Sequence, residues 1–120
     1  MTTLERILWL HACLLPYAWA GLRDLGHHRT HRRVPMAERA LHVAIGLLLM
    51  VVVPHACLGH RDVVLPGLLL FVLARGLDEI FFHRGLAREE IALHARTHLG
   101  FLIFVVGLMG MNWWEAGRAP

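Results

Sequence analysis

The chain lacks the sequence features of several common enzyme classes. It has no Ser-His-Asp set and no phosphate-binding loop, and Cys13 and Cys57 are its only cysteines. All 12 basic residues are arginines. The first residues show no basic segment, which favours a retained first helix. A serine-type hydrolase and a P-loop nucleotide site are therefore not expected.

Apolar residues dominate instead. They make up 57% of the 120 residues, and the mean hydropathy is +0.52, which is too apolar for an ordinary soluble domain. Four apolar runs are each close to the roughly 20 residues that a membrane-spanning helix needs. We therefore predict an all-α fold, an integral membrane four-helix bundle in a single domain over residues 1–120. The four runs are Ile7–Leu22, Ala40–Leu58, Val63–Phe82 and Leu99–Trp114.

The arginines predict the orientation in the membrane. Nine of the 12 flank the connections between the first and second runs and between the third and fourth. By the positive-inside rule these Arg/His-rich connections face the cytoplasm, and both termini lie on the outer side of four spans. The loop HHRTHRR at 27–33 then meets anionic lipid headgroups, and we expect membrane lipids and no nucleic acid as partners.

Two parts of the sequence repeat. ERALH at 38–42 matches EIALH at 90–94, and DLGHHR at 24–29 matches EIFFHR at 79–84. Each pair falls at the start or the end of an apolar run. This pattern predicts two repeated helical hairpins, at about 4–58 and 63–114.

Each repeated segment contains an acid four residues before a histidine, so that both lie on one helix face. Four such pairs occur, whereas 9 acids and 10 histidines would give roughly 0.75 by chance. All four fall at the predicted cytoplasmic end, where buried ionisable groups need compensation. His98 lies one turn beyond the last pair. The pairs are Asp24/His28, Glu38/His42, Glu79/His83 and Glu90/His94.

Two arrangements could compensate the cost of burying these ionisable groups. Each acid can pair locally with its histidine or an arginine and join the helices. Alternatively, the pairs form a dinuclear metal site like those of soluble four-helix bundles. Carboxylate and imidazole suit iron, manganese or zinc, and this end has no cysteine for a soft metal. We favour the dinuclear site, with two divalent ions per chain and iron as the expected metal. Its predicted ligands are Asp24, His28, Glu38, His42, Glu79, His83, Glu90, His94 and His98.

HHRTH at 27–31 and HARTH at 94–98 resemble the histidine boxes of the membrane fatty acid hydroxylase and desaturase group. The resemblance implies a di-iron oxidoreductase that oxidises a lipid-like or other hydrophobic small molecule with dioxygen. The acids at the repeat positions differ from that group and favour a ferritin-like, carboxylate-rich set. The ligands that the resemblance implies are His27, His28, His31, His42, His83, His94 and His98.

The other end of the chain has a repeat of its own. HACL occurs at 11–14 and at 55–58, which places His11 and His55 at matching depth. A disulfide between Cys13 and Cys57, a small metal site, a bis-histidine haem and plain helix packing are all compatible with this pattern.

A b-type haem is the alternative cofactor for both ends. His42 and His94 would supply axial ligands at the cytoplasmic end, and His11 and His55 at the outer end. The chain would then be an electron-transfer or metal-handling subunit of a larger membrane complex. Haem leaves the acids unexplained. Transport of metal by one monomer is not expected, because the middles of the last three runs carry no polar residue, although a homo-oligomer could form a path.

Overall fold

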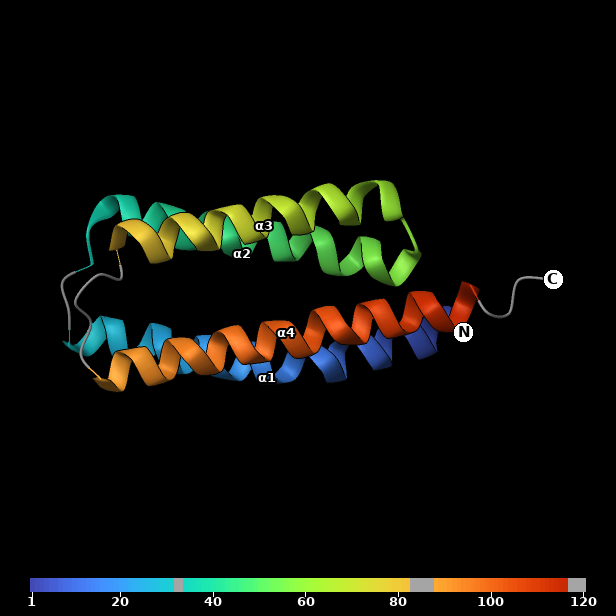
Figure 1. Ribbon diagram of the computed structural model, residues 1–120, viewed down its shortest axis with the longest axis horizontal. Helices are drawn as coiled ribbons and strands as arrows, with labels where there is room; N and C mark the ends of the chain where they lie inside the picture. The colour runs from blue at the N-terminus through green and yellow to red at the C-terminus, as the bar shows by residue number, and fades with distance from the viewer. Residues whose placement is uncertain (32–33, 83–87, 117–120) are drawn as a thin grey trace. The chain divides into compact units, whose positions relative to one another are not determined.

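The structure is a computed structural model that describes residues 1–31, 34–82 and 88–116, except the side chains of 27–31 and 112–116. The described residues form four α-helices (Figure 1). This confirms the predicted all-α, four-helix chain. The helices are α1 (Thr3–His31), α2 (Met36–Leu58), α3 (Arg61–Phe82) and α4 (Arg88–Ala116).

Helices α2 and α3 pack against each other and form one compact unit (Figure 1). Gly59 ends α2 with a positive φ of 81°, a conformation that favours glycine because it has no Cβ. The Gly59 N–H donates to Ala56 O over 3.1 Å, and the His60 N–H donates to His55 O over 2.9 Å. This tight reversal places α3 antiparallel to α2.

Helices α1 and α4 form the second compact unit. A Cβ on Gly100 would lie 2.6 Å from the backbone nitrogen of Tyr17, and one on Gly107 would collide with Cys13. Trp9 Nε1 donates a hydrogen bond to Gly107 O over 2.9 Å. Glycine at these two places therefore lets α4 approach the backbone of α1 closely.

Each helix buries one stripe of side chains spaced by three or four residues. On α3 the stripe runs through Val64, Gly67 and Phe71 to Asp78. The other stripes follow the same plan, apolar along most of their length with an acid near one end. The buried acids are Asp24 on α1, Glu38 on α2, Asp78 on α3 and Glu90 on α4.

Two helical segments, Met36–Leu58 and Arg88–Met111, are long and apolar enough to cross a membrane. The four spans expected from the sequence are thus only partly matched. Arg75, Asp78 and Glu79 make the last two turns of α3 more polar than these two segments. Helix α1 is less hydrophobic because aromatic and polar side chains interrupt its apolar run.

The compact units do not coincide with the hairpins expected at 4–58 and 63–114. The α1–α4 unit and the α2–α3 unit each take one helix from either half of the chain. The sequence repeat stays a prediction.

Substitution of Gly100 should separate α1 from α4. Because an added methyl would meet the Tyr17 backbone, which cannot move as a side chain can, we expect Gly100→Ala to destabilise the protein by about 1–3 kcal/mol. The measurement is denaturant unfolding of the purified chain. Gly110→Ala is the matched control, since a Cβ there meets no atom within 4 Å. Equal destabilisation by both variants would contradict the close approach.

Candidate metal centre

Glu38, His42 and Asp78 form a group in the α2–α3 unit that could hold a metal ion. Each offers one ligand atom, and these atoms lie within 4.8 Å of one another. Glu38 and Asp78 are both 0% exposed, and His42 is half-buried. Three oxygen or nitrogen donors of this kind match the preferences of iron, manganese and zinc.

Helix geometry explains how the three side chains meet. Glu38 and His42 lie one turn apart, so they project from the same face of α2. Glu38 also lies in the first turn of α2, where the helix dipole favours a negative charge. Asp78 lies two turns after the buried Phe71 on the face of α3 that packs against α2.

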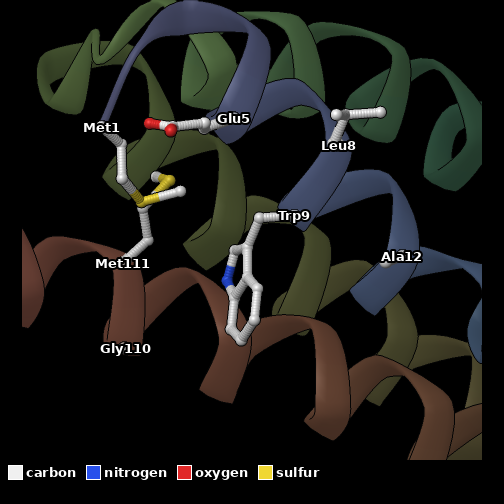
Figure 2. A pocket seen from close by; sticks show the side chains of 7 residues that line it. All are labelled: Met1, Glu5, Leu8, Trp9, Ala12, Gly110 and Met111. Carbon is white, nitrogen blue, oxygen red and sulfur yellow. The ribbon is translucent and has the colours of Figure 1, made fainter.

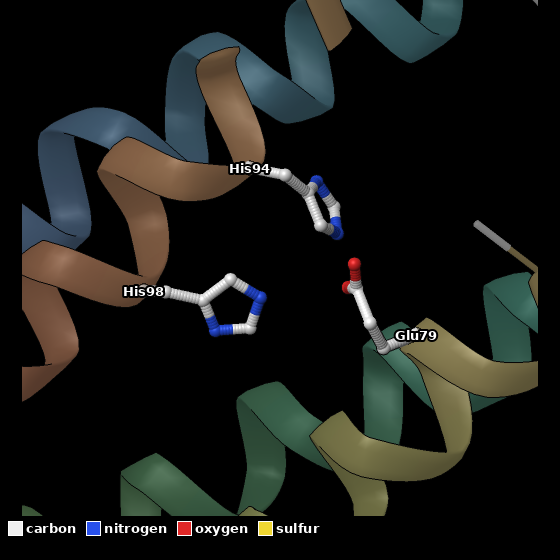
Figure 3. Close-up of side chains that lie close together, drawn as sticks. All are labelled: Glu79, His94 and His98. Atoms are coloured by element: carbon white, nitrogen blue, oxygen red, sulfur yellow. The ribbon is translucent and has the colours of Figure 1, made fainter. Parts of the chain in front are cut away.

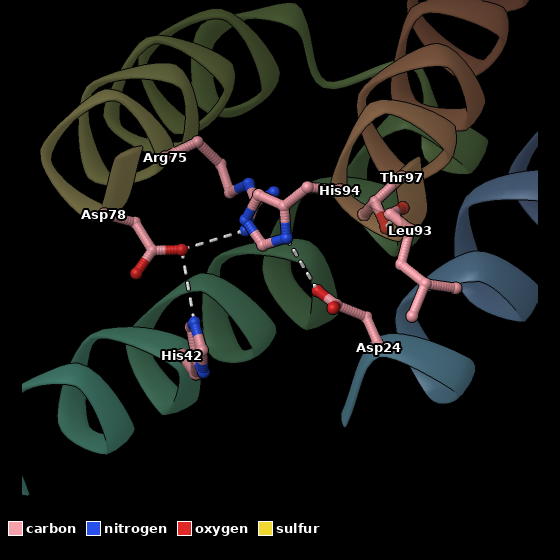
Figure 4. A network of polar contacts seen from close by, with 7 residues as sticks. All are labelled: Asp24, His42, Arg75, Asp78, Leu93, His94 and Thr97. Carbon is pink, nitrogen blue, oxygen red and sulfur yellow. Dashed lines mark hydrogen bonds and ion pairs between the residues drawn. The ribbon is translucent and has the colours of Figure 1, made fainter. Parts of the chain in front are cut away.

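One carboxylate oxygen takes both side-chain contacts of Asp78 that Figure 4 draws. His42 Nε2 lies 3.1 Å from Asp78 Oδ2, and it donates when that nitrogen carries the proton. Arg75 Nη1 donates to the same oxygen over 3.1 Å. Arg75 precedes Asp78 by three residues, so α3 itself holds the guanidinium beside the carboxylate.

The charges of this group set its chemistry. Glu38 and Asp78 bring two negative charges into a buried place, and Arg75 brings one positive charge. Buried charges are costly unless they are balanced. An imidazolium at His42 or a bound metal cation would each add positive charge beside these carboxylates. The first makes the group a polar link between α2 and α3, and the second makes it a metal centre.

The α1–α4 unit carries a related contact between an aspartate and a histidine. Asp24 on α1 and His94 on α4 are both buried, and so is Glu90, one turn before His94. Asp24 Oδ2 is 3.1 Å from His94 Nδ1 (Figure 4). Thr97 is buried next to them and donates to Leu93 O over 3.1 Å. In both units, therefore, an aspartate on one helix lies against the histidine of a Glu-x-x-x-His on the other.

His94 and His98, two predicted ligands one turn apart on α4, differ in exposure. The rings of His94 and His98 lie 5.7 Å apart at 76° on α4 (Figure 3). His94 is 3% exposed, whereas His98 is exposed. The buried stripe continues from Glu90 and His94 to Thr97, because residues spaced by four advance by about 40° more than a full turn at each step.

Four expected ligands lie outside the described residues: the side chains of His27, His28 and His31 and the whole of His83. Glu79 is exposed on α3, while its neighbour Asp78 lies in the buried group. The sequence analysis missed Asp78 and Arg75 because it followed the spacing between Glu79 and His83. The stripe through Val64 and Phe71 would have pointed to Asp78.

The opposite end of the helices has its own polar contacts. His11 Nδ1 lies 2.7 Å from Ile7 O, one turn back on α1, and His55 contacts His60 through ring nitrogens 3.0 Å apart. Cys13 and Cys57 are both free thiols in the structure.

A cavity of about 880 Å³ lies in the α1–α4 unit (Figure 2). Among the described residues that line it, Glu5 has the one ionisable side chain, and its carboxylate accepts the backbone N–H of Thr2 over 2.8 Å and so caps α1. The cavity therefore suits an apolar group. Trp9 in its wall precedes Asp24 by roughly 22 Å of helix, so the cavity does not adjoin the acid/His set. It is lined by Met1, Glu5, Leu8, Trp9, Ala12, Gly110 and Met111.

Comparison of the chain with protein-family models, with curated proteins and with solved structures finds no match. The candidate site therefore rests on the side chains of this chain alone.

Replacement of Asp78 should be far more damaging than replacement of Glu79. Asp78→Asn removes the charge that balances Arg75 inside the protein, and loss of one partner from a buried pair costs about 3–5 kcal/mol. Glu79→Gln is the matched control on the adjacent, exposed position and should lower the free energy of unfolding much less, because solvent screens an exposed charge. Thermal and denaturant unfolding measure both. Similar losses in the two variants would contradict the assignment of Asp78 to the buried group.

Proposed function

We propose that the chain is a metal-binding integral membrane protein that holds two divalent ions, one in each helix pair. The observation that carries the proposal is the double occurrence of one arrangement, an aspartate against a Glu-x-x-x-His on the paired helix. In the α2–α3 pair the ligands are Glu38, His42 and Asp78. In the α1–α4 pair they are Asp24, Glu90 and His94.

The outward surfaces of the helices support a membrane location. Outside its buried stripe each helix exposes large apolar side chains, such as Leu15 at 66%, Met50 at 74% and Leu65 at 67%. Soluble monomers rarely expose apolar surface over so much of their length. We propose four spans, with α1 and α3 crossing beside the two more apolar helices and the Arg-rich connections in the cytoplasm.

Two features of the α2–α3 group support metal binding. First, its donors are two carboxylates and one imidazole, which suit iron, manganese and zinc better than copper(I). Second, Arg75 donates a hydrogen bond to Asp78 and so holds the carboxylate that would bind the ion, as groups around metal ligands commonly do. Arg75 also offsets part of the negative charge of the two carboxylates.

Iron gives the activity that we favour. Iron bound to carboxylates and histidines can activate dioxygen. Hydrophobic substrates can reach such a site from the lipid around the helices. We therefore propose oxidation of a lipid-like molecule, which the resemblance to the fatty acid hydroxylase group also implies. The carboxylates of this chain balance the charge of the metals, and the histidines fix their positions.

Elemental analysis of the detergent-purified protein tests the metal sites. We expect about two ions of iron, manganese or zinc per chain. Glu38→Ala and Glu90→Ala should each remove one, and the double variant should remove both. Glu89→Ala is the matched control, because Glu89 is the exposed neighbour of Glu90 and its loss should leave the metal content unchanged. Undiminished metal in the double variant, or a Soret band showing that haem occupies the histidines, would refute the proposal.

Alkaline extraction tests the membrane location separately. A protein that crosses the bilayer stays with the membranes at high pH, whereas a protein held only by its arginines is released. We expect the wild-type chain and the Glu38→Ala/Glu90→Ala variant to remain in the membrane pellet alike. Release of the wild-type chain would show that its helices do not span.

A further inference from the structure

A second kind of metal site lies at the turn between α2 and α3. We propose that His55 and His60 together chelate one divalent transition-metal ion of the type that imidazole prefers, such as copper(II), nickel(II) or zinc. The site is separate from the candidate centre at Glu38, because 17 residues of α2 place the two roughly 26 Å apart.

The backbone fixes where the two histidines stand. His55 lies in the last turn of α2, and His60 follows the left-handed Gly59. The His60 N–H donates to His55 O over 2.9 Å, and the N–H groups of Val63 and Val64 donate to His60 O. His60 is thus held between the end of one helix and the start of the next, which limits the conformational entropy lost on binding an ion.

The rings already face each other through their ligating atoms. The two Nδ1 atoms are 3.0 Å apart, and the ring centroids are 5.3 Å apart with an angle of 42° between the planes. Only one proton fits between two such nitrogens. Two nitrogens bound tetrahedrally at 2.0–2.1 Å from zinc are about 3.3 Å apart. A metal ion can therefore replace the shared proton after a small opening of the rings.

The surroundings leave room for the rest of the coordination sphere. His60 is exposed and His55 is half-buried, so water can complete the shell. Cys57 is the nearest cysteine along α2, but it is buried. The site is consequently a nitrogen and water site, open to exchange, and it suits borderline metals that reach the protein from solution.

Titration of the detergent-purified full chain with copper(II) tests the site. Electron paramagnetic resonance should show one copper per chain at this site, with nitrogen superhyperfine splitting from two imidazoles. His55→Ala and His60→Ala should each weaken binding at least tenfold, and the double variant should abolish this signal. His11→Ala is the matched control, because His11 is an exposed histidine held by its own helix at Ile7 O.

The Glu38→Ala/Glu90→Ala variant separates this site from the buried centres. It should bind copper at the turn as the wild-type chain does, even with its other metals removed. Circular dichroism of each histidine variant should match that of the wild-type chain, since the backbone hydrogen bonds of the turn do not need the imidazoles. Persistence of the two-imidazole signal in the double histidine variant would overturn the proposal, as would its absence from the wild-type chain.

Discussion

The burial of charge within apolar helix pairs governs the arrangement of this protein. Asp78 is fully enclosed, and its carboxylate is tolerable there because His42 and Arg75 both reach the same oxygen. Arg75 lies one turn before Asp78 on α3, and His42 reaches Asp78 from α2. The close packing of the two helices therefore also fixes the positions of their polar groups.

An aspartate lies against a histidine of the paired helix in both pairs, although the order of the helices differs. In the α2–α3 pair the Glu-x-x-x-His helix comes first in the chain, and in the α1–α4 pair the aspartate helix comes first. If the two halves of the sequence are copies, each pair joins one helix from either copy. Each set of ligands then takes its Glu-x-x-x-His from one copy and its aspartate from the other.

The sequence contained enough to predict the helices, two of the three candidate ligands in the α2–α3 pair and all three in the α1–α4 pair. The spacing of Glu38 and His42, and of Glu90 and His94, shows in the letters because both residues of a pair lie on one helix. Asp78 could not be found in that way. Neighbouring residues on a helix point about 100° apart, and the choice between Asp78 and Glu79 depends on which face meets α2. That face is set by packing with another segment, which a local pattern does not contain.

The choice of helix partners was also hidden from the sequence analysis. Hydrophobic periodicity shows that a helix has a face to bury but not which helix will cover it. The short Gly59 turn does favour the α2–α3 pair. For α1 and α4 the informative residues are Gly100 and Gly107, whose lack of a side chain matters only because the backbone of α1 and Cys13 lie opposite.

The pairing of α1 with α4 has a consequence for biogenesis. The α2–α3 hairpin can close as soon as its two helices have been made, since only a few residues separate them. Helix α1 is made first, but its partner α4 is made last, and Gly100 of α4 packs against the backbone of Tyr17. Contacts between distant parts of a chain form late. Asp24 therefore meets His94 only after most of the chain has been made.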